Sequence, residues 1–239
     1  MRLLQPSLRL LLLSALLVGL SACSSSPEFE LDFEAEIVRL DSAEAVQQAQ
    51  AIEQAVAPQP AEGLAIRLWA SEALLADPIA LDTDPQGRVY ATGSSRSGGL
   101  LDVRGHPDWT TEVLTLRTVE DQRDFIRREM APERSEENTW LPDLNEDGSH
   151  DCRDLTVQKE RLYRIEDTTG DGLADRSQVI AAGFNSELTD AAGGLLVDGD
   201  DIYVGAFPAV WRLRDRSGDG VIDDVEPLCY GYGVHFGFF

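Results

Sequence analysis

The sequence is poor in cysteine and histidine, with three of each in 239 residues. No two cysteines are spaced as a CxxC pair, which excludes a zinc ribbon and a c-type haem attachment site within this chain. Basic residues are also scarce: 20 Lys and Arg stand against 43 Asp and Glu, for a net charge of −23. Because so little positive charge is available to neutralise phosphates, we expect no nucleic acid as a partner.

The N-terminal residues 1–22 have the features of an export signal. A positive start is followed by an apolar run over residues 10–20, which is too short to span a bilayer. Residues 20–23, Leu-Ser-Ala-Cys, then resemble the bacterial lipobox, and Ser24 resembles the sorting residue of outer-membrane lipoproteins. We therefore predict lipidation of Cys23 and an anchor in the outer membrane, facing the periplasm. The alternative is an ordinary cleaved signal with a chance cysteine.

Residues 23–62 are acidic and rich in Ala and Gln, and predict a tether followed by a spacer helix. Asp41 or Ser42 can cap this helix, which should run to about Val56 and end at the prolines that follow. Large apolar side chains are few, so we expect the helix to be solvated.

From residue 63 to 239 the pattern is that of β-structure. Residues 64–69 alternate between apolar and polar, which favours a strand. Residues 77–92 have the pattern of a strand, an Asp-Pro-x-Gly turn and a second strand, and residues 193–205 repeat this layout. An insertion over about residues 94–160 separates these hairpins. It contains a predicted helix from Thr118 to about Met130, which Thr118 and Asp121 can begin as a capping box. We expect the arginines of this helix either to face solvent or to pair with local acids, rather than to form a binding patch.

An internal sequence repeat, over residues 162–175 and 210–223, indicates the fold. A period of 40–50 residues with short strands and turns is typical of a β-propeller, so we predict an all-β chain with about two blades. The repeat lies 48 positions apart, from Asp167 to Asp215. Its shared residues are Arg164, Asp167, Gly170, Asp171, Gly172 and Asp175, which recur as Arg212, Asp215, Gly218, Asp219, Gly220 and Asp223.

Each copy contains an acidic loop with the spacing of a calcium loop, and a third such loop lies upstream. Alternate oxygen ligands can turn toward one centre, and the glycine at position six permits the sharp turn. Position twelve is an acid in the upstream loop and in the loop that begins at Asp215, whereas Gln178 stands there in the loop that begins at Asp167. The alternative is that Asp-Gly pairs simply form turns. The candidate ligands are Asp143, Asn145, Asp147, Asp151 and Asp154; Asp167, Thr169, Asp171 and Asp175; and Asp215, Ser217, Asp219, Asp223 and Glu226.

The remaining reactive side chains give weaker signals. We expect His106 to lie in a turn and His150 to point to solvent. Cys152 and Cys229 can form a disulfide in an oxidising compartment, or they can remain as two free buried thiols.

Residues 140–149, residues 154–165, the two Gly-Asp-Gly loops and Gly231-Tyr-Gly-Val-His235 together resemble a known family. This is the group of membrane-bound dehydrogenase-like β-propellers of planctomycetes and their relatives. They are distantly similar to sugar dehydrogenases that use pyrroloquinoline quinone. The resemblance covers roughly residues 64–239 and implies a six-bladed propeller with any active site in its central funnel.

By this resemblance, His235 is the candidate catalytic base that would act on a substrate hydroxyl beside calcium and the quinone. The alternative for His235 is a structural role. The family's longer members carry a C-terminal cytochrome c domain, so haem is expected only if such a domain follows. The chain departs from the pattern in having no haem motif and only about two of the six blades.

Two functions remain open. The first is the N-terminal part of a lipid-anchored propeller that oxidises a sugar or alcohol and passes electrons to a cytochrome c. We would expect this piece alone not to catalyse. The second is a calcium-stabilised propeller that binds glycan or protein at the cell envelope without catalysis.

Overall fold

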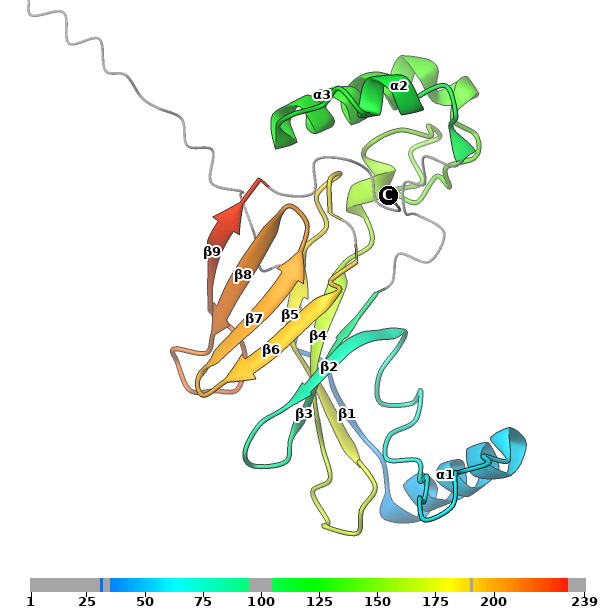
Figure 1. The fold of residues 1–239 in the computed structure, drawn as a ribbon, viewed down its shortest axis with the longest axis vertical. Coiled ribbons are helices and arrows are strands. Elements are labelled where there is room, and N and C mark those ends of the chain that lie inside the picture. The colour runs from blue at the N-terminus through cyan, green and yellow to red at the C-terminus, as the bar shows by residue number, and fades with distance from the viewer. Residues whose placement is uncertain (1–30, 32–34, 95–104, 190, 232–239) are drawn as a thin grey trace, which may run out of the picture.

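The computed structural model describes residues 31, 35–94, 105–189 and 191–231. Two antiparallel β-sheets form the body of the molecule, and three α-helices lie at its ends, with α1 at the opposite end from α2 and α3 (Figure 1). The expected all-β class is therefore confirmed at the level of a mainly β chain.

The first sheet has five strands in the order β1-β5-β4-β3-β2. Its last four strands follow one another in the chain as an antiparallel meander, and β1 adds to its outer edge. The strands are β1 (Ile37–Arg39), β2 (Pro78–Thr83), β3 (Val89–Gly93), β4 (Glu160–Glu166) and β5 (Arg176–Gly183).

The second sheet is a meander of four consecutive strands, in the order β6-β7-β8-β9. The hairpins predicted over residues 77–92 and 193–205 are both present, as β2–β3 and β6–β7. We call β2–β5 the first unit and β6–β9 the second unit. The strands of the second unit are β6 (Gly194–Asp198), β7 (Asp201–Ala206), β8 (Ala209–Arg214) and β9 (Asp224–Tyr230).

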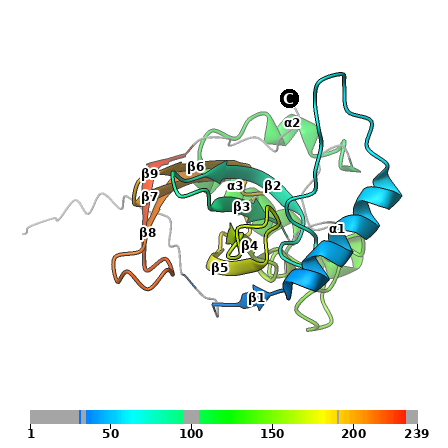
Figure 2. The same cartoon turned by 90° about the horizontal axis from the view of Figure 1, so that it is seen from below.

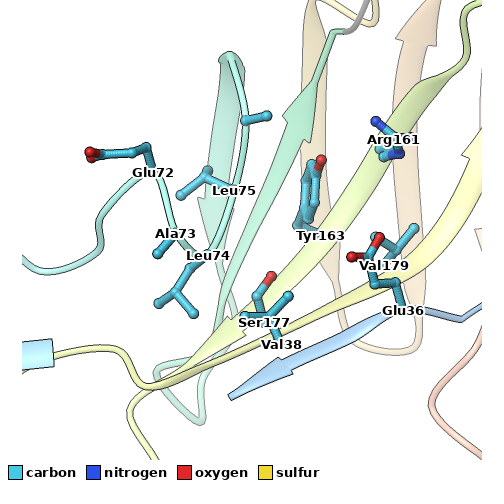
Figure 3. Close-up of a pocket in the computed structure, with 11 residues that line it drawn as sticks. Glu36, Val38, Glu72, Ala73, Leu74, Leu75, Arg161, Tyr163, Ser177 and Val179 are labelled. Carbon is cyan, nitrogen blue, oxygen red and sulfur yellow. The ribbon is translucent and has the colours of Figure 1, made fainter. Parts of the chain in front are cut away.

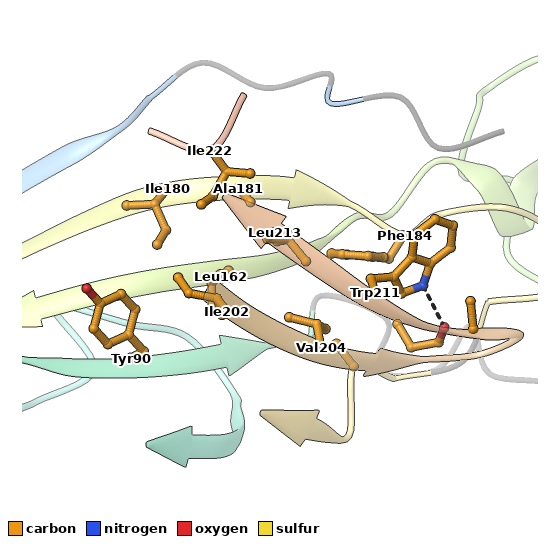
Figure 4. Close-up of a cluster of buried hydrophobic side chains, with 13 residues drawn as sticks. Tyr90, Leu162, Ile180, Ala181, Phe184, Ile202, Val204, Trp211, Leu213 and Ile222 are labelled. Atoms are coloured by element: carbon orange, nitrogen blue, oxygen red, sulfur yellow. Dashed lines mark hydrogen bonds between the residues drawn. The ribbon is translucent and has the colours of Figure 1, made fainter. Parts of the chain in front are cut away.

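The two units pack face to face around a shared apolar core (Figure 4). Strands β3, β4 and β5 of the first unit and β7 and β8 of the second contribute buried residues to it, as expected where two sheets pack face to face. Leu162 and Ile180 come from the first unit, and Trp211 and Leu213 from the second. The Trp211 indole N–H donates to the carbonyl of Ala206 at 2.9 Å, so this buried ring has its hydrogen-bond partner. The neighbouring strands β2 and β6 also touch, as Figure 2 shows.

An N-terminal cap, which we define as β1, α1 and residues 69–75, adjoins the first unit. Residues 69–75 cover the opposite face of β3–β5, β1 extends the sheet at the edge of β5, and α1 packs beside residues 173–174. Helix α1 (Ser42–Val56) begins after Asp41, whose side chain accepts the N–H of Ala43, as the sequence predicted. The helix is docked rather than solvated, because its Ala45 and Ala49 are buried. Two further hydrogen bonds hold it, from the Leu68 N–H to Glu53 and from the Ser71 hydroxyl to Gln48.

The strand predicted over residues 64–69 is wrong. These residues are extended but pair with no strand, and Leu64 and Ile66 are 68% and 58% exposed. Alternation of apolar residues predicts a strand only where a sheet edge is available to pair with it.

The insertion between β3 and β4 carries a second core of its own, around Phe125, Ile126 and Met130. Helix α2 (Thr110–Val113) precedes α3 (Val119–Glu129), and 3-10 turns follow at Pro132–Glu137 and Asp154–Thr156. The predicted capping box is present, because Thr118 and Asp121 each accept the other's backbone N–H. The predicted pairing of the helix arginines with local acids is also confirmed, by Arg127 with Glu187 and by Arg128 with Glu112 and Glu129.

Candidate cation-binding loops

Two acidic loops occupy the same place in the two units. Residues 167–175 join β4 to β5, and residues 215–223 join β8 to β9. Strands rather than helices therefore flank both loops. The third loop, residues 143–154, lies in the insertion.

The first aspartate of each repeat loop organises the turn. Asp167 accepts the N–H groups of Gly170 and Gly172 at 2.7 and 2.9 Å, one on each carboxylate oxygen. Asp215 accepts the corresponding two N–H groups at 2.6 Å each. The glycine at position six has a φ of 92° at Gly172 and 87° at Gly220, a conformation that side chains disfavour. The two loops are therefore built by the same contacts.

The remaining aspartates of these loops are held in the same way. Asp171 and Asp219 accept the N–H two residues later, at 3.0 and 2.9 Å. Asp175 and Asp223 reach back to the start of their loops, to Thr168 and to Arg216 and Ser217, respectively. At position three, the hydroxyls of Thr169 and Ser217 donate to the first aspartate.

The pKa values of two loop carboxyls reflect these contacts. Burial raises the pKa of Asp167, but the N–H groups of Gly172 and Gly170 outweigh it, so the pKa lies below its usual range. The N–H of Arg216 likewise lowers the pKa of Asp223. Both groups are anionic at neutral pH, as a cation ligand must be.

The loop in the insertion has a similar network. Asp143 accepts the N–H groups of Asp147 and Gly148 at 3.2 and 3.0 Å, and Asn145 accepts the N–H of Asp147 at 2.9 Å. Asp154, at position twelve, is buried and accepts the N–H groups of residues 144, 145 and 151. The Asp154 carboxylate therefore closes this loop by binding the backbone N–H groups of the loop.

Asp151, at position nine, is engaged by a neighbouring cation. Its side chain is fully buried and pairs with Arg153, with 2.5 Å between Oδ2 and Nη2. The hydrogen bond from Arg153 is the main reason that the pKa of Asp151 falls to about 2. The Ser149 hydroxyl donates to both Asp147 and Asp151. A metal at position nine would have to compete with this ion pair.

Position twelve of the repeat loops does not reach the loop oxygens. Glu226 lies on β9 opposite Arg212 and forms an ion pair with it. Gln178 occupies the same position on β5 and accepts a hydrogen bond from Arg164 at 2.8 Å. In both units the residue at position twelve is thus committed to the repeated arginine of the neighbouring strand.

The donor chemistry of the three loops fits a hard cation. A carboxylate oxygen has two lone-pair sites, so an oxygen that accepts one N–H keeps capacity for a metal. Within the part of the chain that the structure describes, no group of three or more His, Cys, Asp or Glu side chains converges as a metal site. Any metal would therefore use loop carbonyls, Asn145 or the hydroxyls of Thr169 and Ser217 besides one or two carboxylates.

The histidine and cysteine expectations have mixed outcomes. His150 is half-buried, with its Nδ1 2.7 Å from the Leu141 carbonyl, so the prediction that it points to solvent is wrong. His106 stacks on Trp109, with 3.9 Å between the ring centroids. Cys152 and Cys229 are free thiols, the first half-buried and the second exposed. Both Cys23 and His235 lie outside the described residues.

Sequence reasoning missed Glu160, the first residue of β4. Its carboxylate is fully buried and accepts the Ser94 hydroxyl at 2.7 Å and the Ala192 N–H at 3.0 Å. It therefore ties the ends of β3 and β4 to the connection that leads into β6. No motif marks it, because its partners are distant in the sequence.

A hollow of about 240 Å³ lies between the first unit and the cap (Figure 3). Tyr163 and Ser177 line it from the sheet, and Val38 and residues 72–75 line it from the cap. The Ser177 hydroxyl is buried and has no hydrogen-bond partner among the described residues. In the second unit the residue equivalent to Tyr163 is Trp211, which packs against Phe184. The hollow is thus a place where the cap covers its sheet less completely than the first unit covers the second.

Comparison with known proteins gives one family. Residues 53–235, most of the chain, match a family described as a domain of unknown function, DUF7133. The chain belongs to this family. The match to DUF7133 begins inside α1, so the docked helix is partly included with both units and the insertion. No curated protein and no solved structure gives a significant match. No helix among the described residues is both long and apolar enough to cross a membrane.

Proposed function

We propose that the two units are successive blades of a β-propeller whose Gly-Asp-Gly loops bind calcium. The observation that carries the proposal is that both units place the same loop, with the same hydrogen bonds from backbone to carboxylate, between their last two strands. Each unit is a four-stranded antiparallel meander, as in a propeller blade, and the units follow one another face to face. A six-bladed ring is the form that the family resemblance implies.

Calorimetric titration of the chain with calcium tests the metal. We expect saturable binding, and a rise of about 5 °C in Tm in excess calcium that a chelator reverses, because an ion that binds only the folded state stabilises it. Asp219→Ala should remove part of this rise. Asp200→Ala is the matched control, since Asp200 is an exposed aspartate in the turn between β6 and β7. The absence of binding heat, together with the same Tm with and without calcium, would refute the proposal.

We further propose that the protein containing these blades is anchored at the cell envelope through Cys23. The support is the lipobox-like sequence at residues 20–23. Mass spectrometry of the native protein should find a diacylated or triacylated N-terminal cysteine, and Cys23→Ser should move the protein out of the membrane fraction. An unmodified mature N-terminus would count against the anchor.

For the activity, we propose oxidation of a sugar or alcohol by a quinone-dependent enzyme that contains these blades. Its support is the resemblance over residues 140–235, with His235 as the candidate base. A quinone bound in the funnel would supply the hydride or electron acceptor, and the residue assigned beside it lies outside the described part of the chain. The full native protein should reduce a dye with pyrroloquinoline quinone and a panel of sugars and alcohols. A loss of activity in His235→Asn, with calcium binding retained, would assign that residue.

The second candidate is a propeller that binds glycan or protein without redox chemistry. The repeated acidic loops support it, because calcium bound there would stabilise a propeller without any redox chemistry. Binding to envelope glycans by the full protein, without dye reduction, would select this alternative.

A further inference from the structure

The first unit packs against the second unit through one face of its sheet. The second unit has the equivalent face on its outer side. In the first unit, Leu162 and Ile180 point toward the second unit and are 1% and 2% exposed. Their equivalents 48 positions later are Val210, which is half-exposed, and Leu228, which is 47% exposed. The same positions therefore form a buried interface in one unit and an uncovered surface in the other.

Among the contacts between the units, two involve the Gly-Asp-Gly loop of the second unit. The N–H of Ile222, just after the Gly-Asp-Gly loop, donates to the Ile180 carbonyl at 2.8 Å. Gly220 of the same loop lies against the guanidinium of Arg164, so closely that a Cβ there would come within 3.0 Å of Nη2. A glycine loop of one unit thus docks on the repeated arginine of the preceding unit.

The cap makes the corresponding bond on the other side of the first unit. Ala174 is the first-unit equivalent of Ile222, and its N–H donates to the Trp69 carbonyl at 2.7 Å. This N–H is already used, and the face around it is covered by α1 and residues 69–75. In a second copy of this chain, the face of the first unit that would have to bind here is therefore already covered by its own cap.

We propose that the outer face of the second unit is an interaction surface for a further unit of the same kind, an antiparallel β-meander with its own Gly-Asp-Gly loop. The loop glycine of that unit would lie against Arg212, and the N–H that follows it would donate to the Leu228 carbonyl. The apolar remainder of the surface consists of Leu196, Tyr203 and Val210. Tyr203 is the equivalent of Tyr90, which is 6% exposed in the core between the units. The proposal rests on the proposed function only in treating the units as blades, and it requires neither calcium nor catalysis.

A lengthened chain tests this directly. Residues 184–231, one repeat length, are inserted again between Gly231 and residue 232, in a chain whose Cys23, Cys152 and inserted cysteine are serine. Cys229 then reports on the face, because it follows Leu228 on β9, is exposed, and corresponds to the fully buried Ala181. We expect its reaction with a thiol reagent to slow by about tenfold relative to the chain without the insert, since docking makes the thiol accessible only through local opening.

Arg212→Gln in the lengthened chain should restore much of the labelling rate. Arg214→Gln is the matched control, because Arg214 lies on the same strand and is likewise ion-paired, with Asp201. Equal labelling with and without the insert would overturn the proposal, and so would an insert that exchanges its amide hydrogens as an unstructured chain. A labelling rate that falls with increasing concentration of the original chain would assign the face to a second copy, which also overturns it.

The same samples separate this inference from calcium binding. Labelling is measured with calcium and with a chelator, and calcium binding is measured by calorimetry. Slow labelling in a chain that binds no calcium would leave the docking surface standing and remove the metal. Calcium binding with an unchanged labelling rate would support the metal and remove the docking surface.

Discussion

The first unit is enclosed on both faces, whereas the second unit is enclosed on one. The cap covers one face of β3–β5 and the second unit covers the other, so Ala91, Tyr163, Leu162 and Ile180 are all buried, whereas β2 at the edge stays largely exposed. The second unit has the same pattern of strands and apolar positions, yet its outer positions are exposed. The burial of equivalent apolar residues in the two units therefore depends on whether another layer packs against that face, and not on the sequence of the unit itself.

The largest test of this comparison uses two equivalent apolar residues. Ile180→Ala should lower the free energy of unfolding by about 3 kcal/mol, because it leaves a cavity in the core between the units. Leu228→Ala should cost about 0.5 kcal/mol or less, because the side chain is already in contact with water. Urea unfolding measures both. Equal losses would mean that the outer face of the second unit is covered.

The next test concerns the third loop, which has an arginine where the repeat loops do not. Arg153→Gln should lower the free energy of unfolding, because it leaves the buried carboxylate of Asp151 without its cation. The pKa of Asp151 is lowered in the folded state, to about 2 from 3.8. Its stabilisation is therefore complete above about pH 4 and is lost as the pH falls toward 2.

Unfolding measured from pH 6 to pH 2 should show this loss in the original chain and a much flatter curve in Arg153→Gln. Arg216→Gln, at an exposed arginine of the loop after β8, is the control. Parallel curves for the original chain and Arg153→Gln would rule out the assigned role of the Asp151 pair.

The repeated arginine should also differ between the units. Arg164→Gln should cost about 1 kcal/mol, since Arg164 lies between the units against Gly220 and donates to Gln178. Arg212→Gln should cost a few tenths of a kcal/mol at most, because its ion pair with Glu226 is partly exposed. Thermal unfolding of the two variants measures both losses. Equal losses would mean that the outer face of the second unit is covered.

The smallest effect is chemical and leaves stability unchanged. Burial raises the pKa of the Cys152 thiol, which lies against the core of the insertion, whereas Cys229 is exposed on the outer face. At pH 8 the Cys229 thiol should therefore react faster with an alkylating reagent. Single serine variants at each position identify the two rates, and a faster Cys152 would contradict the exposure of β9.

The sequence predicts the features that depend on nearby residues. Asp41 and Thr118 mark the starts of α1 and α3, because a cap needs only the first turn of its own helix. The Asp-Pro-x-Gly turn marks the β2–β3 hairpin for the same reason. The repeat of Asp167 at Asp215 indicates two loops of equal construction, which their hydrogen bonds reproduce.

Features that depend on distant contacts escape the sequence. Strand β1 has three residues and forms only because the edge of β5 is available to it. The docking of α1 depends on Ser71 and Leu68, and the position of His150 depends on the Leu141 carbonyl. The spacing of Glu226 suggests a metal ligand, but its strand register places it beside Arg212. The calcium ligands, Cys23 and His235 remain predictions.

The carbonyl of Trp69, which accepts the N–H of Ala174, has a consequence for how the chain folds as it leaves the ribosome. The cap emerges first and offers the first unit the bond that a preceding unit would offer, so that unit can complete its core without waiting for the end of the chain. The first unit then offers the same bond, through Ile180, to the second. Assembly thus has a direction, in which each finished layer is the template for the next.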